Sequence, residues 1–209
     1  CMGCKMNHIK LSINKWLTLS PVLLALFLVA CAGQETKPGP VSAENKLTLY
    51  VKNNTAYLSG ILEADLPSKL TKMIRQHPNV TDIVLVDVPG TDDQQATMEG
   101  ARLIRRLGLN THIAATGYVL SGGVDLFLGG VKRSIGAGAG VGVHAWSDNV
   151  GTVANKLNKM NPVHATYVNF YLEMGVPERF YWFSIQAAPA SRVYFLSPEE
   201  MYDYQLVTE

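Results

Sequence analysis

The first elements of the chain appear as two kinds of apolar pattern. Apolar side chains alternate along residues 47–51 and 55–62, and polar residues separate the two runs, so a β-hairpin is predicted. Residues 65–77 instead have apolar positions at helical spacing, which predicts a helix. Asp82–Val88 (DIVLVDV) is a near-continuous apolar run, typical of a strand buried on both faces.

Strand and helix patterns continue to alternate up to the end of the chain. Strands are predicted at 111–115, 132–135 and 141–144, and helices at 94–107, 162–174 and 177–187. Ser197-Pro198-Glu199-Glu200 is a capping box with proline at the first helical position, and it predicts a last helix. This alternation at short spacing predicts a single α/β domain built from βαβ units.

The N-terminal segment has a different pattern. Lys5, Lys10 and Lys15 precede an apolar run, Trp16–Ala30, which is shorter than the ~20 residues of a membrane-spanning helix. A basic region followed by a short apolar run predicts a secretion signal. The alternative is an uncleaved anchor helix with an incidental cysteine at Cys31.

The residues Leu28-Val29-Ala30-Cys31 resemble the lipobox of bacterial lipoproteins, in which the cysteine is lipidated and becomes the mature N-terminus. The resemblance implies a lipid-anchored protein of the bacterial envelope that faces the periplasm. In a Gram-negative host, Ala32 after the cysteine would imply outer-membrane sorting.

Composition then divides the chain into three parts. Residues 31–46 are polar and contain proline and glycine, which indicates a flexible tether between a signal segment, 1–30, and a folded domain, 47–209. The chain has 209 residues and is 47% hydrophobic, enough for one domain with a real core.

Charge and cysteine positions exclude several functions. The net charge is +1, but residues 1–30 hold lysines and no acid, so the folded part is slightly acidic and nucleic-acid binding is not expected. The three cysteines are Cys1, Cys4 and Cys31. The domain therefore has no thiol for a disulfide, a zinc cluster or a cysteine nucleophile.

Ser121 is the first candidate for chemistry. It stands between a strand-like run and Gly122-Gly123, where a helix N-terminus would stabilise negative charge. Residue 119 is valine, so the G-x-S-x-G pattern of an α/β-hydrolase is missing. On this local pattern alone, a serine before two glycines is more often a helix cap or turn residue.

Alternating glycines over residues 136–142 raise the question of nucleotide binding. The run lacks the lysine and the downstream acid of known nucleotide motifs, so close backbone packing is favoured. His144 follows at the end of an apolar strand, and taken alone it would be a structural histidine.

Taken in order, several short motifs carry a family resemblance. They are Val88-Pro89-Gly90-Thr91, Ser121-Gly122-Gly123, Lys132-Arg133, Val141-Gly142-Val143-His144 and Phe195-Leu196-Ser197-Pro198-Glu199-Glu200. Together they resemble the Clp protease proteolytic subunit and its crotonase-fold relatives, above all the periplasmic ClpP-like proteins. The resemblance spans residues 47–207 and implies a ClpP/crotonase-like spiral of βαβ units.

The resemblance also implies a site. Ser121 matches the nucleophile and His144 the general base, while the N–H groups of Gly122 and of Gly90 or Thr91 match the oxyanion hole. No cofactor or metal is implied. The expected substrate is a peptide or an ester, and the expected assembly is a homo-oligomer.

Two departures from the family pattern concern this site. Gly90 is followed by threonine rather than glycine, and the acid that would orient the histidine falls on Val193. Candidate replacements are a backbone carbonyl or one of four side chains, Asp148, Glu173, Ser191 and Asp203.

Further residues stay open at this level. His164 is expected to be a partly exposed helix residue rather than part of the site. Asp125 either lines the pocket or has a solvated or capping role. Seven aromatic residues between 167 and 183 would serve as core, interface or substrate groove.

The leading hypothesis is a serine hydrolase that uses a Ser121–His144 dyad through an acyl-enzyme. The alternative is a tethered scaffold or binding lipoprotein that kept the fold and lost the chemistry, and the missing acid supports it. Crotonase-like acyl-CoA chemistry is disfavoured, because an extracytoplasmic protein meets little CoA and no basic patch suits its phosphates.

Overall fold

The computed structural model describes residues 45–208. The predicted signal segment, the lipidation site Cys31 and nearly all of the predicted tether lie outside the described residues. Within the described segment, no helix combines the length and apolar character needed to cross a membrane.

A seven-stranded sheet is the centre of the domain. Its strands follow the order β1-β2-β3-β4-β6-β7, and β5 pairs with β4. The strands are β1 (Thr48–Lys52), β2 (Thr55–Ser59), β3 (Asp82–Val88), β4 (Asn110–Leu120), β5 (Arg133–Ile135), β6 (Gly140–Val143) and β7 (Tyr194–Phe195). The predicted hairpin is the antiparallel pair β1–β2, and β2, β3, β4 and β6 run parallel.

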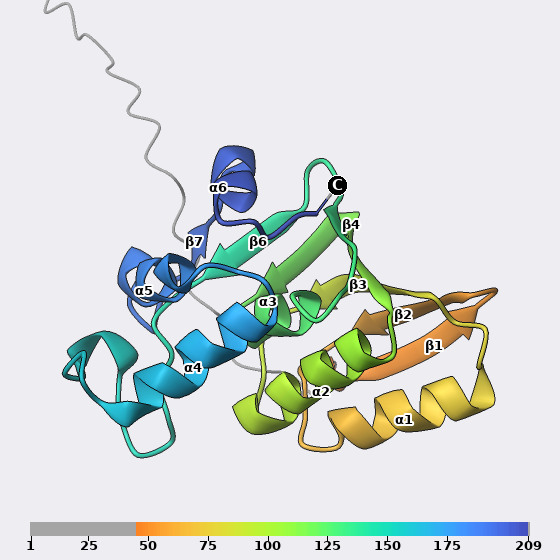
Figure 1. Cartoon of the computed structure of the whole chain (residues 1–209), viewed down its shortest axis with the longest axis horizontal. Helices are drawn as coiled ribbons and strands as arrows, with labels where there is room; N and C mark the ends of the chain where they lie inside the picture. Colours follow the sequence, from red (N-terminus) through yellow and green to blue (C-terminus); the bar gives the residue numbers. More distant parts are fainter. Residues whose placement is uncertain (1–44, 209) are drawn as a thin grey trace, which may run out of the picture. The chain divides into compact units, whose positions relative to one another are not determined.

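Helices connect and cover these strands. They are α1 (Leu66–Gln76), α2 (Gln94–Arg106), α3 (Gly122–Phe127), the 3-10 turn η2 (Ala154–Lys156), α4 (Pro162–Glu173), α5 (Glu178–Ala187) and α6 (Pro198–Asp203). Figure 1 shows α1 and α2 side by side along the sheet, with β7 and α6 at the other end from β1 and α1. The mixed α/β fold predicted from the sequence is confirmed.

The core forms where the helices meet the sheet. Leu58, Ile83 and Leu85 of the central strands are completely buried, as are Leu66 of α1 and Ile104 of α2. Burying such side chains removes apolar surface from water, at roughly 1.5–3 kcal/mol for each residue. This packing fixes the helices against the strands that carry the site.

Polar side chains define where the helices begin. The predicted capping box is confirmed, because Ser197 Oγ accepts from the N–H of Glu200 at 3.2 Å and a Glu200 carboxylate oxygen accepts from the N–H of Ser197 at 2.9 Å. Asp93 similarly caps α2 by accepting from the N–H of Ala96 at 2.9 Å.

Strand β4 differs from the prediction and positions the site. Residues 111–115 were expected as a short strand, but β4 continues without a break to Leu120. Its first half pairs with β5 and its last three residues pair with β6. The strand changes partners near Gly117, where an added Cβ would lie 2.7 Å from the Val86 carbonyl oxygen. The end of β4 is thereby brought beside β6.

The glycine run packs closely against its neighbours, as predicted. A Cβ on Gly136 would lie 2.5 Å from the Cα of Ala115, and a Cβ on Gly142 would lie 2.3 Å from Val193 Cγ1. Side chains at these positions would push the strands apart. The glycines therefore serve the sheet rather than a nucleotide.

Candidate active site

Three parallel strands deliver the predicted site residues to one edge of the sheet. β3 ends before Pro89-Gly90-Thr91, β4 ends before Ser121, and β6 ends before His144. Because β4 pairs in parallel with both β3 and β6, these carboxyl ends lie next to one another. Ligands of open α/β sheets bind outside this edge.

Ser121 occupies a strained turn between β4 and α3. Its backbone has φ 53° and ψ −125°, a region that residues other than glycine rarely adopt and that costs roughly 1–3 kcal/mol. The Ser121 N–H donates to the Gly142 carbonyl at 2.9 Å and its carbonyl accepts from the Val124 N–H at 2.9 Å. Ser121 stands in a turn at the N-cap position of α3, but its side chain makes no capping hydrogen bond. The turn resembles a nucleophile elbow although the sequence pattern is absent.

Ser121 and His144 line the same small pocket. The pocket has a volume of about 30 Å³, enough for roughly two water molecules. Its other polar side chains include Gln94 and Asp125, and its aromatic wall consists of Trp146, Tyr167, Tyr171 and Tyr181. Within residues 45–208, no hydrogen bond joins the Ser121 hydroxyl to His144, so a rotation about the serine χ1 or a shift of the ring must accompany proton transfer.

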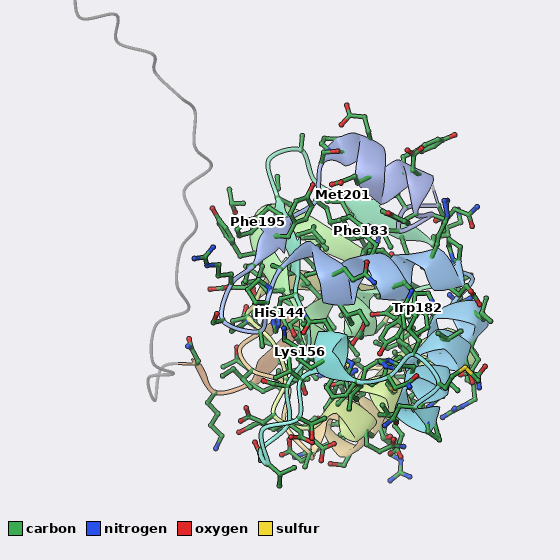
Figure 2. The ribbon with its side chains drawn as sticks, turned by 90° about the vertical axis from the view of Figure 1, so that its left-hand side faces the viewer. His144, Lys156, Trp182, Phe183, Phe195 and Met201 are labelled. Atoms are coloured by element: carbon green, nitrogen blue, oxygen red, sulfur yellow. The ribbon has the colours of Figure 1, made fainter. Side chains whose placement is uncertain are left out.

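His144 is half-buried and is held by the backbone. Its Nδ1 lies 2.8 Å from the carbonyl oxygen of Ala145. A carbonyl only accepts hydrogen bonds, so the neutral ring carries its hydrogen on Nδ1 and leaves Nε2 as the acceptor. Nε2 is the nitrogen suited to take a proton from a hydroxyl. Figure 2 shows His144 between α5 and the segment that carries Lys156.

The predicted orienting side chains do not reach this ring. Asp148 lies on an exposed loop, where Val150 and Thr152 donate backbone N–H groups to its carboxylate and hydrogen bonding from Thr152 holds its pKa below the usual value. Ser191 is exposed. Among the described residues, no carboxylate or serine hydroxyl bonds to His144. The remaining candidate was a backbone carbonyl, and the structure has one in this place: the carbonyl oxygen of Ala145 lies 2.8 Å from Nδ1 of His144.

The two predicted oxyanion loops touch each other. A Cβ on Gly122 would lie 2.3 Å from Thr91 Cγ2, and a Cβ on Gly90 would lie 3.8 Å from the Cβ of Ser121. In the described part of the chain, the N–H groups of Gly90, Thr91 and Gly122 have no hydrogen-bond acceptor. Free N–H groups from two fixed loops suit an oxyanion.

The threonine that departs from the family pattern anchors its loop. Thr91 Oγ1 donates to the Leu62 carbonyl at 3.0 Å and accepts from the Asp93 N–H at 3.0 Å. Thr97 also donates its hydroxyl hydrogen to Thr91 Oγ1 at 2.8 Å. These bonds hold the loop beside Ser121 without using the backbone N–H of Thr91.

Asp125 is a buried member of the pocket. It is 6% exposed, so a solvated role is wrong. The Tyr171 hydroxyl donates to Oδ1 at 2.7 Å and the Gln94 amide donates to Oδ2 at 2.7 Å. Burial raises the pKa of Asp125 to about 6, and the two hydrogen bonds lower it only in part.

His164 lies behind the pocket wall. It is 2% exposed, so the predicted partial exposure is wrong. Its Nδ1 is 2.6 Å from the Tyr181 hydroxyl, which also accepts from Trp146 Nε1 at 3.3 Å. The sequence pattern of α4 did not predict this burial, because the helix face that carries His164 packs against α5 instead of facing water.

The aromatic residues of α4 and α5 divide between core and pocket. Phe170 and Phe180 are completely buried in the core, whereas Tyr167, Tyr171 and Tyr181 line the pocket. The rings of Tyr167 and Tyr181 stack with centroids 5.3 Å apart. A substrate-groove role for part of this set is therefore compatible with the fold.

Gln94 and Trp146 are among the pocket residues that the sequence reasoning missed. Gln94 opens the helix after β3, and Trp146 lies two residues after His144. Both follow the carboxyl end of a parallel strand, and that position was the available signal. No group of three or more potential metal ligands is present within residues 45–208.

Comparisons with known proteins were made for the sequence and for the structure. No family model matches the sequence, and no curated protein matches it. The Pseudomonas aeruginosa protein PA4980 aligns over 80% of this chain and 77% of its own, with 14% identity and a TM-score of 0.50. An enoyl-CoA hydratase from Thermoplasma volcanium aligns over 78% of this chain and 70% of its own, with 12% identity and a TM-score of 0.50.

A membrane protease from Pyrococcus horikoshii, 1510-N, specific for a stomatin homolog, is also similar. It aligns over 76% of this chain and 73% of its own, with 17% identity and a TM-score of 0.47. At such identities a structural likeness speaks for the fold and not for the activity. The chain therefore has the ClpP/crotonase-like α/β fold that its motifs predicted.

Proposed function

We propose that this protein is a serine hydrolase that cleaves an amide or an ester through an acyl-enzyme on Ser121. One observation carries the proposal: a strained serine that caps nothing shares a pocket with a histidine whose Nε2 is free to accept a proton. Strained backbone persists where the surrounding structure enforces it, often at functional sites.

The chemistry follows from the roles of these groups. As Ser121 Oγ attacks the carbonyl carbon, Nε2 of His144 takes the hydroxyl proton. The N–H groups of Gly122 and of Gly90 or Thr91 bind the oxyanion. Collapse of the intermediate breaks the bond to the leaving group, which receives the proton from His144. Water, deprotonated by the same ring, then attacks the acyl carbon. The bond to Ser121 Oγ breaks, His144 returns the proton to Oγ, and the acid product leaves.

A fluorophosphonate probe tests this proposal directly. We expect covalent labelling of the purified protein that is lost in Ser121→Ala and strongly slowed in His144→Ala. Ser184→Ala is a matched control, because Ser184 lines the same pocket but donates its hydroxyl hydrogen to the Phe180 carbonyl. An unlabelled wild type, or equal labelling of Ser121→Ala, would contradict the proposal.

The lipobox-like segment supports a second part of the proposal, a lipid anchor on Cys31 in the bacterial envelope with the domain facing the periplasm. Cells fed a radiolabelled fatty acid should incorporate label into the wild type and not into Cys31→Ala, while Cys4→Ala serves as the control. Release of unlabelled Cys31→Ala from the membrane fraction is expected. Labelling of Cys31→Ala to the same extent as Cys4→Ala would contradict a lipid anchor on Cys31.

Self-association is proposed from the same family resemblance. Light scattering on the purified protein should report a mass that is a multiple of the protomer. A monomer at all concentrations that can be measured would contradict it.

One observation favours a second candidate function, a binding scaffold without chemistry. Within residues 45–208, His144 has no carboxylate partner, and carboxylates normally stabilise the imidazolium of a Ser-His site. The scaffold requires that Ser121→Ala and His144→Ala leave the cellular role intact. A loss of that role in either variant would favour the hydrolase.

A further inference from the structure

Asp125 is the one acidic side chain of the pocket, and the proposed mechanism does not use it. Each of its oxygens accepts a hydrogen bond from a neutral group, Tyr171 or Gln94. No lysine or arginine lines the described pocket, where His144 is the only side chain able to become a cation. The carboxylate thus has no fixed counter-charge.

Such an arrangement is costly for the free protein. Buried charges are normally paired, because an anion in a low-dielectric site loses its hydration. Neutral donors replace that hydration incompletely, and the raised pKa of Asp125 reflects the deficit. A cation that enters the pocket would recover part of this energy.

The pocket wall limits what can enter. Trp146, Tyr167 and Tyr181 form its aromatic part, but Tyr167 stacks on both other rings with centroids 5.3 Å apart in each pair, so these faces are turned to one another. The pocket volume of about 30 Å³ admits a charged group of the size of one or two water molecules and is too small for an aromatic ring of a substrate.

The position of Asp125 relates this cation to the reaction. Asp125 lies one helical turn after Ser121 on α3, and both line the pocket. A cation held by Asp125 would therefore lie close to the group that Ser121 attacks.

We propose that Asp125 is a specificity-determining residue that binds a primary ammonium group on the acyl part of the substrate. This inference rests on the proposed hydrolase function. The ammonium group is either a lysine side chain or the free α-amine of an N-terminal residue. Both present the same small cation, and the test separates them.

The test compares three thiobenzyl esters at pH 7, where most of Asp125 is ionised because its pKa is about 6 and an α-amine is still largely protonated. They are N-acetyl-lysine, N-acetyl-norleucine, which lacks only the ammonium group, and norleucine with a free α-amine. We expect kcat/KM for one ammonium ester to exceed that of N-acetyl-norleucine by about tenfold or more. In Asp125→Asn this ratio should fall to about one, and the preferred ester identifies the source of the ammonium.

A neutral fluorophosphonate separates the two proposals. If it labels Ser121 in the wild type but the ester ratios of wild type and Asp125→Asn agree, the ammonium site is refuted and the hydrolase stands. Far-UV circular dichroism and a cooperative urea unfolding transition test whether Asp125→Asn is folded.

A binding measurement keeps the inference testable if no turnover is found. n-Butylammonium chloride should raise the Tm of wild type and of Ser121→Ala above that in sodium chloride of equal ionic strength, and should leave Asp125→Asn unchanged. Equal shifts in wild type and Asp125→Asn would overturn the proposal.

Discussion

At the scale of single residues, the most informative feature is the backbone of Ser121. Its φ of 53° together with ψ of −125° lies in a region that costs a residue other than glycine roughly 1–3 kcal/mol. Glycine adopts such a conformation at no steric cost, so substitution reports the strain directly.

Ser121→Gly should therefore be more stable than Ser121→Ala. Relief of strain, roughly 1–3 kcal/mol, exceeds the 0.4–1 kcal/mol that glycine costs through the unfolded chain. Urea denaturation measures the difference. At Ser68, in the ordinary helix α1, the order should reverse, with alanine more stable than glycine. Greater stability of alanine at position 121 would show that the turn is not strained.

Val193 gives a second prediction at this scale. Tyr194 pairs with Val143, so Val193 precedes β7 at the level of His144, and its Cγ1 lies 2.3 Å from the place of a Cβ on Gly142. Val193→Asp should place a carboxylate near the ring and raise kcat by about tenfold or more. Val193→Asn, equal in shape but uncharged, should not do so. Equal rates for the two variants would show that the ring does not gain from an acid.

Asp125 predicts a pH dependence of stability. Its pKa in the folded protein, about 6, lies above the ordinary 3.8, so its contribution to stability is fully present below pH 4 and is lost as the pH rises through 6. The change corresponds to about 3 kcal/mol. Its neighbours Tyr167, Tyr171 and Tyr181 stay neutral over this range because burial raises their pKa values.

The measurement is the free energy of unfolding of wild type and Asp125→Asn between pH 4 and pH 8. Wild type should lose stability relative to the variant as the pH rises, while the other pocket residues are common to both. A constant difference across this range would contradict the burial of an ionising carboxylate.

At the scale of elements, the site depends on how β3 and β4 end. β4 runs long, changes partners, and leaves Ser121 beside β6, while the loop after β3 approaches the start of α3. Close contact between Gly122 and Thr91 keeps the two oxyanion donors together.

Gly122→Ala should disturb this contact. The new Cβ would lie 2.3 Å from Thr91 Cγ2 and 2.8 Å from Thr91 Cβ, so the loops must separate. We expect fluorophosphonate labelling to slow by about 10²-fold, the usual cost of one oxyanion donor. Adding Thr91→Ser to Gly122→Ala removes the contact with Cγ2 but keeps the hydroxyl that anchors the loop, and should restore part of the rate. If the double variant labels as slowly as Gly122→Ala, the slow labelling does not arise from the contact with Thr91.

At the scale of the whole domain, Arg133 joins segments that are far apart in sequence. It is 4% exposed, and its guanidinium donates to carbonyls of Leu128, Met174 and Leu206, near the ends of α3, α4 and the chain. Burial, and then the charge of Arg105, lower its pKa to about 10. The carbonyls at helix ends carry the partial negative charge that replaces a carboxylate partner.

Arg133→Met should lower the free energy of unfolding by about 2–4 kcal/mol, because the carbonyls of Leu206 and Gln205 lose the guanidinium donor. The carbonyls of Leu128 and Met174 still accept from Arg105. Urea denaturation measures this loss. Arg106→Met on the exposed end of α2 is the matched control and should change stability by less than about 0.5 kcal/mol. Equal effects of the two substitutions would show that the hydrogen bonds of Arg133 do not stabilise the domain.

The sequence by itself determined the order and type of most elements. Apolar spacing located α1, α2 and β3, and the Ser197 capping box located α6, because these signals depend on residues close together in the chain. The resemblance of short motifs in order also led to the ClpP/crotonase-like fold and to Ser121 and His144 as the candidate pair.

Only the tertiary structure decided what surrounds that pair. It revealed the strained backbone of Ser121, the hydrogen bond between His144 and the Ala145 carbonyl, and the burial of His164. It also revealed that the buried carboxylate of Asp125 accepts only from neutral groups. The physical reason is that periodicity reports which face of an element is apolar, whereas the partners of a polar side chain come from other elements. Those contacts form only when the carboxyl ends of β3, β4 and β6 meet α4 and α5.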